Sequence, residues 1–97
     1  MKKILLVCNG GYSTAIMAKK INETGEFDVI AKGEAEYLDY IDGCDLIMVG
    51  PQIRHMVPTI KKETNGIAPV ISINPVHYGT MNVVEVIKAA KAELGEN

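Results

Sequence analysis

The sequence predicts an α/β protein of one domain, built on a four-stranded parallel sheet with helices on both faces. Short apolar runs alternate with stretches of helical spacing, and this alternation occurs four times within 97 residues. The runs are almost entirely apolar, which is typical of strands that are buried on both faces of a parallel sheet. The chain length corresponds to one domain near the lower end of the usual size range.

Each apolar run is short, and three of the four are followed directly by asparagine or proline, as expected where a strand enters a loop. The predicted strands are Ile4–Cys8, Phe27–Ala31, Asp45–Gly50 and Val70–Ile73. Parallel strands need crossover connections, so the segments between these runs should form the helices that cover the sheet.

The helical segments are recognised by their spacing and by their ends. The predicted helices are Ser13–Thr24, Glu34–Ile41, a segment that begins near Pro58, and Val83–Leu94. Ser13 can cap the first of them, and Gly25 stands where a C-terminal glycine belongs. Asn82, with Glu85 three residues later, predicts the cap of the last helix. Pro58 interrupts helical spacing that starts at Ile53, which predicts a kink or a tight turn there.

Composition and charge exclude several classes of function. The net charge is -2, and the chain has one phenylalanine and no tryptophan, so nucleic acid is not an expected partner. The apolar run at Ile4–Cys8 is shorter than the roughly seven residues of a signal peptide core, and no later run reaches membrane-spanning length. We therefore expect a cytoplasmic protein without membrane insertion, in which Cys8 and Cys44 remain unpaired thiols.

The segment that follows the first strand carries the most informative chemistry. Ligands bind beyond the carboxyl ends of the strands in such sheets, and Cys8 stands at one of these ends. Two glycines then allow a tight loop whose N–H groups can surround an anion, and the positive end of the next helix favours the thiolate. The hydroxyls of Ser13 and Thr14 can donate to phosphate oxygens. The predicted site consists of Cys8 as nucleophile and the loop Asn9, Gly10, Gly11, Tyr12, Ser13 and Thr14.

Two absences favour a phosphoryl carrier over a hydrolase. Tyrosine phosphatases have an arginine six residues after the cysteine, whereas this chain has Thr14 there. The small phosphatases also take a catalytic acid from an Asp-Pro pair, where this chain offers Asn74-Pro75. A small cysteine-dependent phosphatase or an arsenate reductase remains the alternative.

Three segments resemble a known family over nearly the whole chain. They are LLVCNGGYSTA, DLIMVGPQIRHMVPTIK and INPVHYGTMNVVEVIKAA. Through them, residues 1–97 resemble one enzyme IIB domain of the phosphoenolpyruvate-dependent sugar phosphotransferase system, in the lactose/cellobiose/chitobiose branch. The resemblance implies a fold similar to the P-loop fold of low-molecular-weight tyrosine phosphatases.

The resemblance also implies the reaction. Cys8 would accept a phosphoryl group from a phosphohistidine of enzyme IIA and pass it to a sugar, such as a β-linked disaccharide, bound by membrane enzyme IIC. This phosphotransferase would work as a monomer, with no cofactor and no metal. Asn9, Gly10 and Tyr12 depart from the small residues and the methionine that are typical of the family loop, which affects the choice of partner and sugar.

Further candidates are assigned less central roles. We expect Arg54 and Tyr78 to contact partners, His55 to face solvent, and Cys44 to be a structural thiol. His77 follows the fourth strand, but no second ligand accompanies it in the sequence.

Two other classes of protein fit the residues less well. A response-regulator receiver needs acidic residues after its first and third strands, where this chain has Cys8 and Gly50-Pro51. A flavin-binding electron carrier needs aromatic residues to enclose the flavin, and these are few here.

Overall fold

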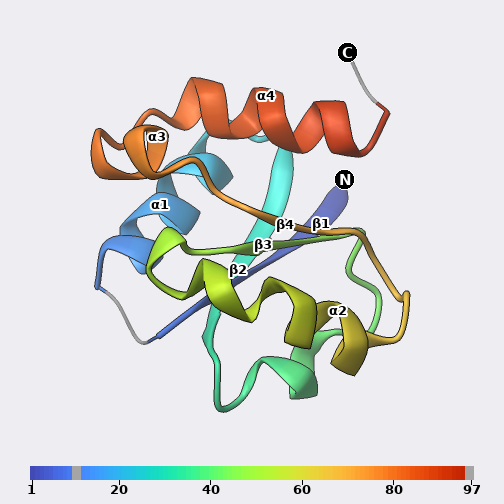
Figure 1. The fold of residues 1–97 in the computed structure, drawn as a ribbon. Helices are drawn as coiled ribbons and strands as arrows, with labels where there is room; N and C mark the ends of the chain where they lie inside the picture. Colours follow the sequence, from blue (N-terminus) through green and yellow to red (C-terminus); the bar gives the residue numbers. More distant parts are fainter. Residues whose placement is uncertain (10–11, 96–97) are drawn as a thin grey trace.

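The computed structural model describes residues 1–9 and 12–95, and it has a four-stranded parallel sheet in the order β2-β1-β3-β4 (Figure 1). The strands are β1 (Lys2–Cys8), β2 (Phe27–Gly33), β3 (Leu46–Val49) and β4 (Val70–Ser72). The helices are α1 (Tyr12–Glu23), α2 (Val57–Thr64), α3 (Pro75–Gly79) and α4 (Val83–Glu93), and two short 3-10 helices are η1 (Tyr37–Tyr40) and η2 (Pro51–Met56). The predicted fold class is confirmed.

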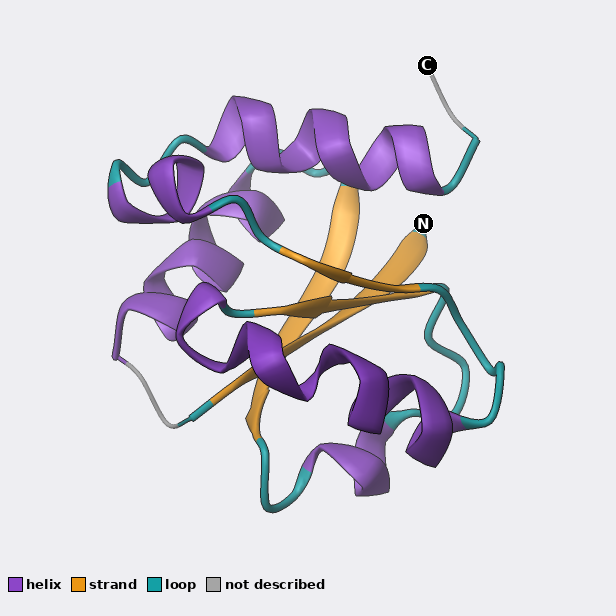
Figure 2. Ribbon diagram, viewed as in Figure 1, coloured by secondary structure: helices purple, strands orange, loops and turns teal. Residues whose placement is uncertain are grey.

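Helices cover both faces of the sheet, as Figure 2 shows. Successive side chains of a strand point to opposite faces, so each inner strand contributes to two separate apolar clusters. On one face Leu6 and Met48 pack with residues of α1, α3 and α4, and on the other Val7 and Val49 pack with residues of η1, η2 and α2. Burial on both faces explains why the strand sequences are continuous apolar runs.

Two predicted helices differ from the structure. The segment predicted as a helix at 34–41 forms only η1, because its start at Glu36 has no side-chain cap to hold a longer helix. The first helix begins at Tyr12, so Ser13 lies inside its first turn and does not cap it. Pro58 stands in the first turn of α2, where its missing N–H has no cost, and α2 does begin near this residue.

Helix α3 was not predicted from the sequence. Its five residues are too few to show helical periodicity, and it exists because Asn74 and Pro75 fix its start.

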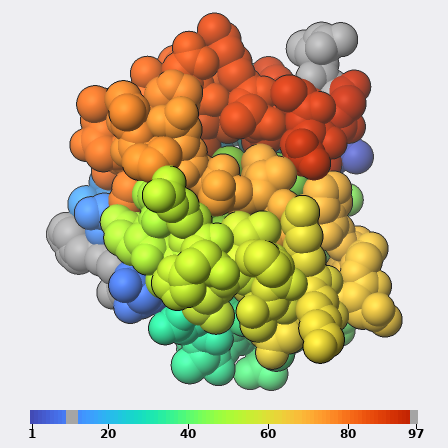
Figure 3. All heavy atoms as spheres, in the orientation of Figure 1, coloured from blue at the N-terminus to red at the C-terminus, as the bar shows by residue number. Residues whose placement is uncertain are grey.

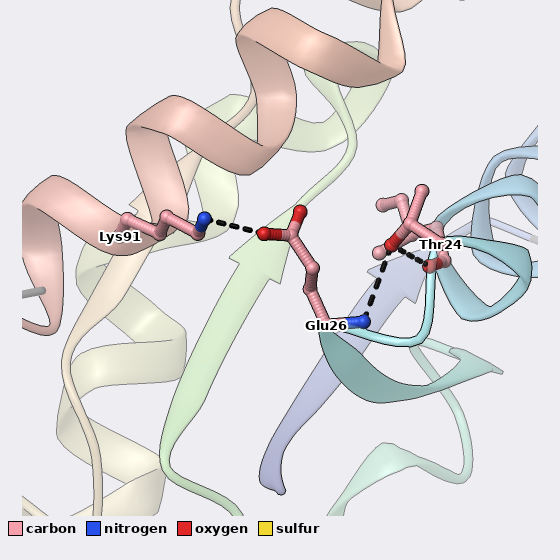
Figure 4. A network of polar contacts seen from close by, with 4 residues as sticks. Thr24, Glu26 and Lys91 are labelled. Carbon is pink, nitrogen blue, oxygen red and sulfur yellow. Dashed lines mark hydrogen bonds and ion pairs between the residues drawn. The ribbon is translucent and has the colours of Figure 1, made fainter. Parts of the chain in front are cut away.

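The far end of α4 is joined to the turn between α1 and β2. The Lys91 Nζ lies 2.5 Å from Glu26 Oε1, and the Glu26 N–H donates to the Thr24 hydroxyl at 3.3 Å (Figure 4). Both charged side chains are partly exposed, so this pair is expected to contribute little to stability, about 1 kcal/mol or less.

Candidate functional site

Cys8 is the last residue of β1, at the carboxyl end of the sheet. It pairs with Gly33 of β2, and its thiol donates to the Lys32 carbonyl oxygen at 3.7 Å. On the other side, the Gly50 N–H donates to the Val7 carbonyl oxygen at 2.9 Å. The Cys8 side chain is 5% exposed. The cysteine is therefore held by a central strand with neighbours on both sides, at the edge where ligands bind in parallel sheets.

The residues after Cys8 lead into the N-terminal turn of α1. Asn9 is exposed, and Ser13 is exposed in the first turn of the helix. Gly10, Gly11 and the side chain of Tyr12, three members of the predicted phosphate loop, lie outside the described residues. What the structure does provide beside Cys8 is the start of a twelve-residue helix, whose free N–H groups and partial positive charge favour an anion.

Thr14 and Tyr78 are placed differently from the sequence-based expectation. The Thr14 hydroxyl was expected to donate to a phosphate, and Tyr78 to contact a partner. Instead Thr14 is 1% exposed and Tyr78 is 5% exposed, and their hydroxyl oxygens lie 2.6 Å apart. Tyr78 belongs to the apolar cluster that contains residues of α1 and α4, and it also lines a surface groove with Arg54.

This pair is the feature of the site that sequence reasoning missed. The two residues are 64 positions apart, and one of them lies on the helix that the sequence did not predict. The only available signal was the capping pattern at Asn74-Pro75, whose residue types favour a helix start.

Tyr78 is held firmly because α3 is fixed at its beginning. The Asn74 Oδ1 accepts hydrogen bonds from the N–H groups of Val76 at 2.8 Å and His77 at 3.3 Å. The Tyr78 N–H donates a hydrogen bond to the Asn74 carbonyl oxygen at 2.9 Å. The N–H of Ile73, the residue before Asn74, donates to the Val49 carbonyl oxygen of β3. The short helix is therefore a rigid extension of the sheet edge.

A shallow groove lies on the surface between η2 and α3, near the carboxyl ends of β3 and β4. The two segments are neighbours on this face of the molecule (Figure 3). The groove is lined by Pro51, Gln52, Arg54, Pro75, Tyr78 and Gly79. Arg54 and His55 are exposed, whereas His77 is half-buried. The described residues contain no group of three or more histidine, cysteine or acidic side chains that could hold a metal ion. Arg54 thus presents the positive charge of this groove.

Cys44 lies at the other end of the sheet, just before β3. Its thiol donates to the Ile41 carbonyl oxygen at 3.1 Å, and burial raises its pKa. A thiol that is kept protonated in this way is a poor nucleophile at neutral pH. Both cysteines are free.

Comparison with known proteins decides the family. Residues 3–89 match the family described as "PTS system, Lactose/Cellobiose specific IIB subunit". The chain belongs to this IIB family of the phosphotransferase system. It is 30% identical over 70 residues to the PTS system oligo-beta-mannoside-specific EIIB component of Bacillus subtilis (strain 168), which covers 67% of this chain and 68% of that protein.

Solved IIB structures share the fold. The lactose-specific IIB component domain of the phosphoenolpyruvate:carbohydrate phosphotransferase system from Streptococcus pneumoniae superposes with a TM-score of 0.76 at 24% identity, covering 95% of this chain and 96% of that one. The cellobiose-specific phosphotransferase IIB component protein from Borrelia burgdorferi gives 0.75 at 29% identity, covering 97% and 92%.

Family membership makes the chain a sugar-specific IIB component with a general phosphotransferase role. It favours the carrier over the phosphatase, arsenate reductase, receiver and flavoprotein interpretations. Of the helices described here, none combines the length and the apolar character needed to cross a membrane.

Proposed function

We propose that this IIB component is a phosphoryl carrier in which the Cys8 sulfur takes a phosphoryl group from a phosphohistidine of enzyme IIA. It then gives the group to a sugar bound by membrane enzyme IIC. The position of Cys8 is the observation that carries this proposal: a thiol at the carboxyl end of a central strand, with three residues between it and the start of α1. Family membership supports it.

The first transfer begins when the Cys8 thiol, which here donates to the Lys32 carbonyl, loses its proton to solvent. The thiolate attacks the phosphorus in line. A sulfur–phosphorus bond forms while the nitrogen–phosphorus bond breaks, and the electron pair of that bond returns to the imidazole ring of IIA. In the second transfer a sugar hydroxyl oxygen attacks the phosphorus, its proton goes to a base of the partner, and the thiolate leaves.

We infer that residues 9–14 hold the phosphoryl oxygens while charge spreads over them in a loose transition state. The N–H groups at the start of α1 and the exposed Ser13 hydroxyl are suitable donors, and fixed donors of this kind stabilise such charge without reorganisation. Thr14 is assigned a different task, because its hydroxyl already pairs with Tyr78.

The remaining assignments are also proposals. Residues 1–97 form one IIB domain that works in the cytoplasm as a monomer, without a cofactor or a bound metal. Arg54, exposed beside the strand ends, contacts a partner protein. The sugar is a β-linked disaccharide, for which the names of the cellobiose- and lactose-specific relatives are the support.

Intact-mass measurement tests the proposal. The protein is incubated with phosphoenolpyruvate, the general phosphotransferase proteins and a lactose/cellobiose-type IIA. We expect one added phosphoryl group on the wild type and none on Cys8→Ser, because a serine hydroxyl is not ionised at neutral pH. Cys44→Ser is the matched control and should be phosphorylated like the wild type. Phosphorylation of Cys8→Ser, or none of the wild type beside a phosphorylated IIA, would contradict the proposal.

An aryl phosphate separates the carrier from the phosphatase alternative. A carrier should not turn this substrate over, because no arginine stands six residues after Cys8. Steady release of inorganic phosphate that depends on Cys8 would instead support a hydrolase.

A further inference from the structure

The hydrogen bond between Thr14 and Tyr78 joins two parts of the molecule that the chain connectivity leaves far apart. Thr14 is in the first turn of α1, directly after the segment that follows Cys8, and Tyr78 is on α3. Their oxygens are 2.6 Å apart and both side chains are buried. A buried hydroxyl that lost this partner would be left without the water that normally replaces it, so the pair should persist.

The pair fixes the first turn of α1. Cys8 is fixed by the sheet, because it belongs to β1 and pairs with Gly33. Cys8 and Thr14 are therefore each held by a residue far away in the sequence. Anchoring both ends of a short connection lowers the number of conformations that it can adopt.

The anchor at Tyr78 is itself rigid. Asn74 holds the start of α3 through two backbone N–H groups, and the Thr80 hydroxyl donates to the Val76 carbonyl oxygen at 2.8 Å near its end. The Asn82 N–H donates to the His77 carbonyl oxygen at 2.8 Å. A displacement of the Tyr78 hydroxyl would thus require α3 to move relative to β4 and α4.

We propose that Tyr78 is a positioning residue for the phosphoryl transfer at Cys8, an inference that rests on the function proposed above. Through Thr14 it holds the first turn of α1, and hence the Ser13 hydroxyl and the adjoining N–H groups, in place for the phosphoryl oxygens. Donors that are already in place stabilise the transition state most effectively. A displacement of about 1 Å can lower a rate roughly a hundredfold.

The kinetic consequence differs from that of a partner contact. A positioning residue affects the rate constant of transfer once the phosphorylated IIA is bound. A surface residue that contacts IIA mainly affects the IIA concentration needed for half-maximal rate. The burial of Tyr78 predicts the first behaviour.

Single-turnover transfer from phosphorylated IIA to Cys8, followed by intact mass over a range of IIA concentrations, tests the proposal. Tyr78→Phe and Thr14→Val should each lower the rate at saturating IIA roughly tenfold to a hundredfold, with an unchanged half-saturating concentration. Thr14→Ser keeps the hydroxyl and should restore most of the rate. The double variant should be no slower than the slower single variant, because one hydrogen bond is lost in each case.

Matched controls separate positioning from general destabilisation. The Tyr37 hydroxyl donates to Glu63 at 2.6 Å, and the buried Thr64 hydroxyl donates to the Ile60 carbonyl oxygen at 2.8 Å. Tyr37→Phe and Thr64→Val remove comparable hydroxyls from the opposite face of the sheet. Both should transfer at the wild-type rate at a temperature where all variants are folded.

Amide hydrogen exchange provides a readout that needs no partner. Tyr78→Phe should accelerate exchange in the first turn of α1 more than Tyr37→Phe does. Wild-type rates and exchange in Tyr78→Phe, or a change confined to the half-saturating concentration, would overturn the positioning role while Cys8 phosphorylation stood. A wild-type protein that takes no phosphoryl group would instead overturn the proposed function and the inference together.

Discussion

Residue scale

Two buried, free cysteines lie at opposite ends of the sheet. Cys8 stands at the carboxyl end, next to the start of α1. Cys44 stands before β3, where burial, with smaller contributions from the carboxylates of Asp45 and Asp42, raises its pKa. A negative neighbourhood and a low dielectric both disfavour a thiolate. Cys44 therefore stays protonated at neutral pH, whereas the proposed nucleophile Cys8 lies at the opposite end of the sheet.

The raised pKa of Cys44 predicts a loss of stability at alkaline pH. The ordinary pKa of the thiol is 9.0, and that of the folded protein is higher. Above pH 9 the unfolded chain releases a proton that the folded chain keeps, so the free energy of unfolding falls as pH rises toward the folded pKa. Urea denaturation at about pH 8 and about pH 10 should show this fall.

Cys44→Ala should reduce the loss in free energy of unfolding between about pH 8 and about pH 10. Tyr37→Phe is a suitable comparison, because burial and Glu63 raise the pKa of Tyr37 as well, and its contribution appears only at higher pH, above 10. If Cys44→Ala lost as much stability over this interval as the wild type, the thiol would not be the group responsible.

Element scale

Asparagine begins both helices of the C-terminal third of the chain. Asn74 Oδ1 accepts from two N–H groups of α3, and Asn82 Oδ1 accepts from the Glu85 N–H at the start of α4. Both asparagines cap a helix by the same kind of hydrogen bond, but their expected effects on phosphoryl transfer differ. Only α3 carries the tyrosine that reaches α1.

Replacing each cap by alanine should separate stability from activity. Asn74→Ala and Asn82→Ala should each lower the free energy of unfolding by about 1 kcal/mol, the usual value for a lost N-cap. Only Asn74→Ala should also slow transfer to Cys8, because it releases the helix that positions Tyr78. Urea denaturation and the single-turnover assay measure the two effects, and equal rates in both variants would argue against a role for α3.

Whole-molecule scale

The two faces of the one sheet contribute to two different apolar clusters. Because the strands are shared, the two clusters cannot unfold independently. Leu46 and Ile47 are neighbours in β3 and are both fully buried, yet they belong to opposite clusters. Loss of β3 would remove the paired neighbour of both β1 and β4. A small domain of this kind is expected to unfold in a single transition.

Large-to-small substitutions on the two faces should therefore have similar effects. We expect Leu46→Ala and Ile47→Ala each to lower the free energy of unfolding by about 2–5 kcal/mol, through lost burial and a residual cavity. Circular dichroism and tyrosine fluorescence should give coincident urea transitions in both variants. A second transition in either variant would show that the faces unfold separately.

The sequence alone determined the fold class, the four strands and the position of Cys8. Short continuous apolar runs are typical of strands that are covered on both faces, and the residue types that begin and end helices act locally. The caps at Asn82 and Gly25 were predicted correctly for that reason. The segment 34–41 was predicted wrongly as a helix, because its residue types alone do not reveal that only one turn is stable there.

Tertiary structure alone decided the strand order and the internal partner of Thr14. Both depend on pairings between residues far apart in the chain, which no local pattern records. Tyr78 illustrates the reason: its residue type suits a surface contact as well as a buried hydrogen bond, and only the tertiary packing of α3 places its hydroxyl beside that of Thr14. Local patterns specified where Cys8, the proposed nucleophile, lies, and long-range packing specified that the Thr14 hydroxyl meets Tyr78.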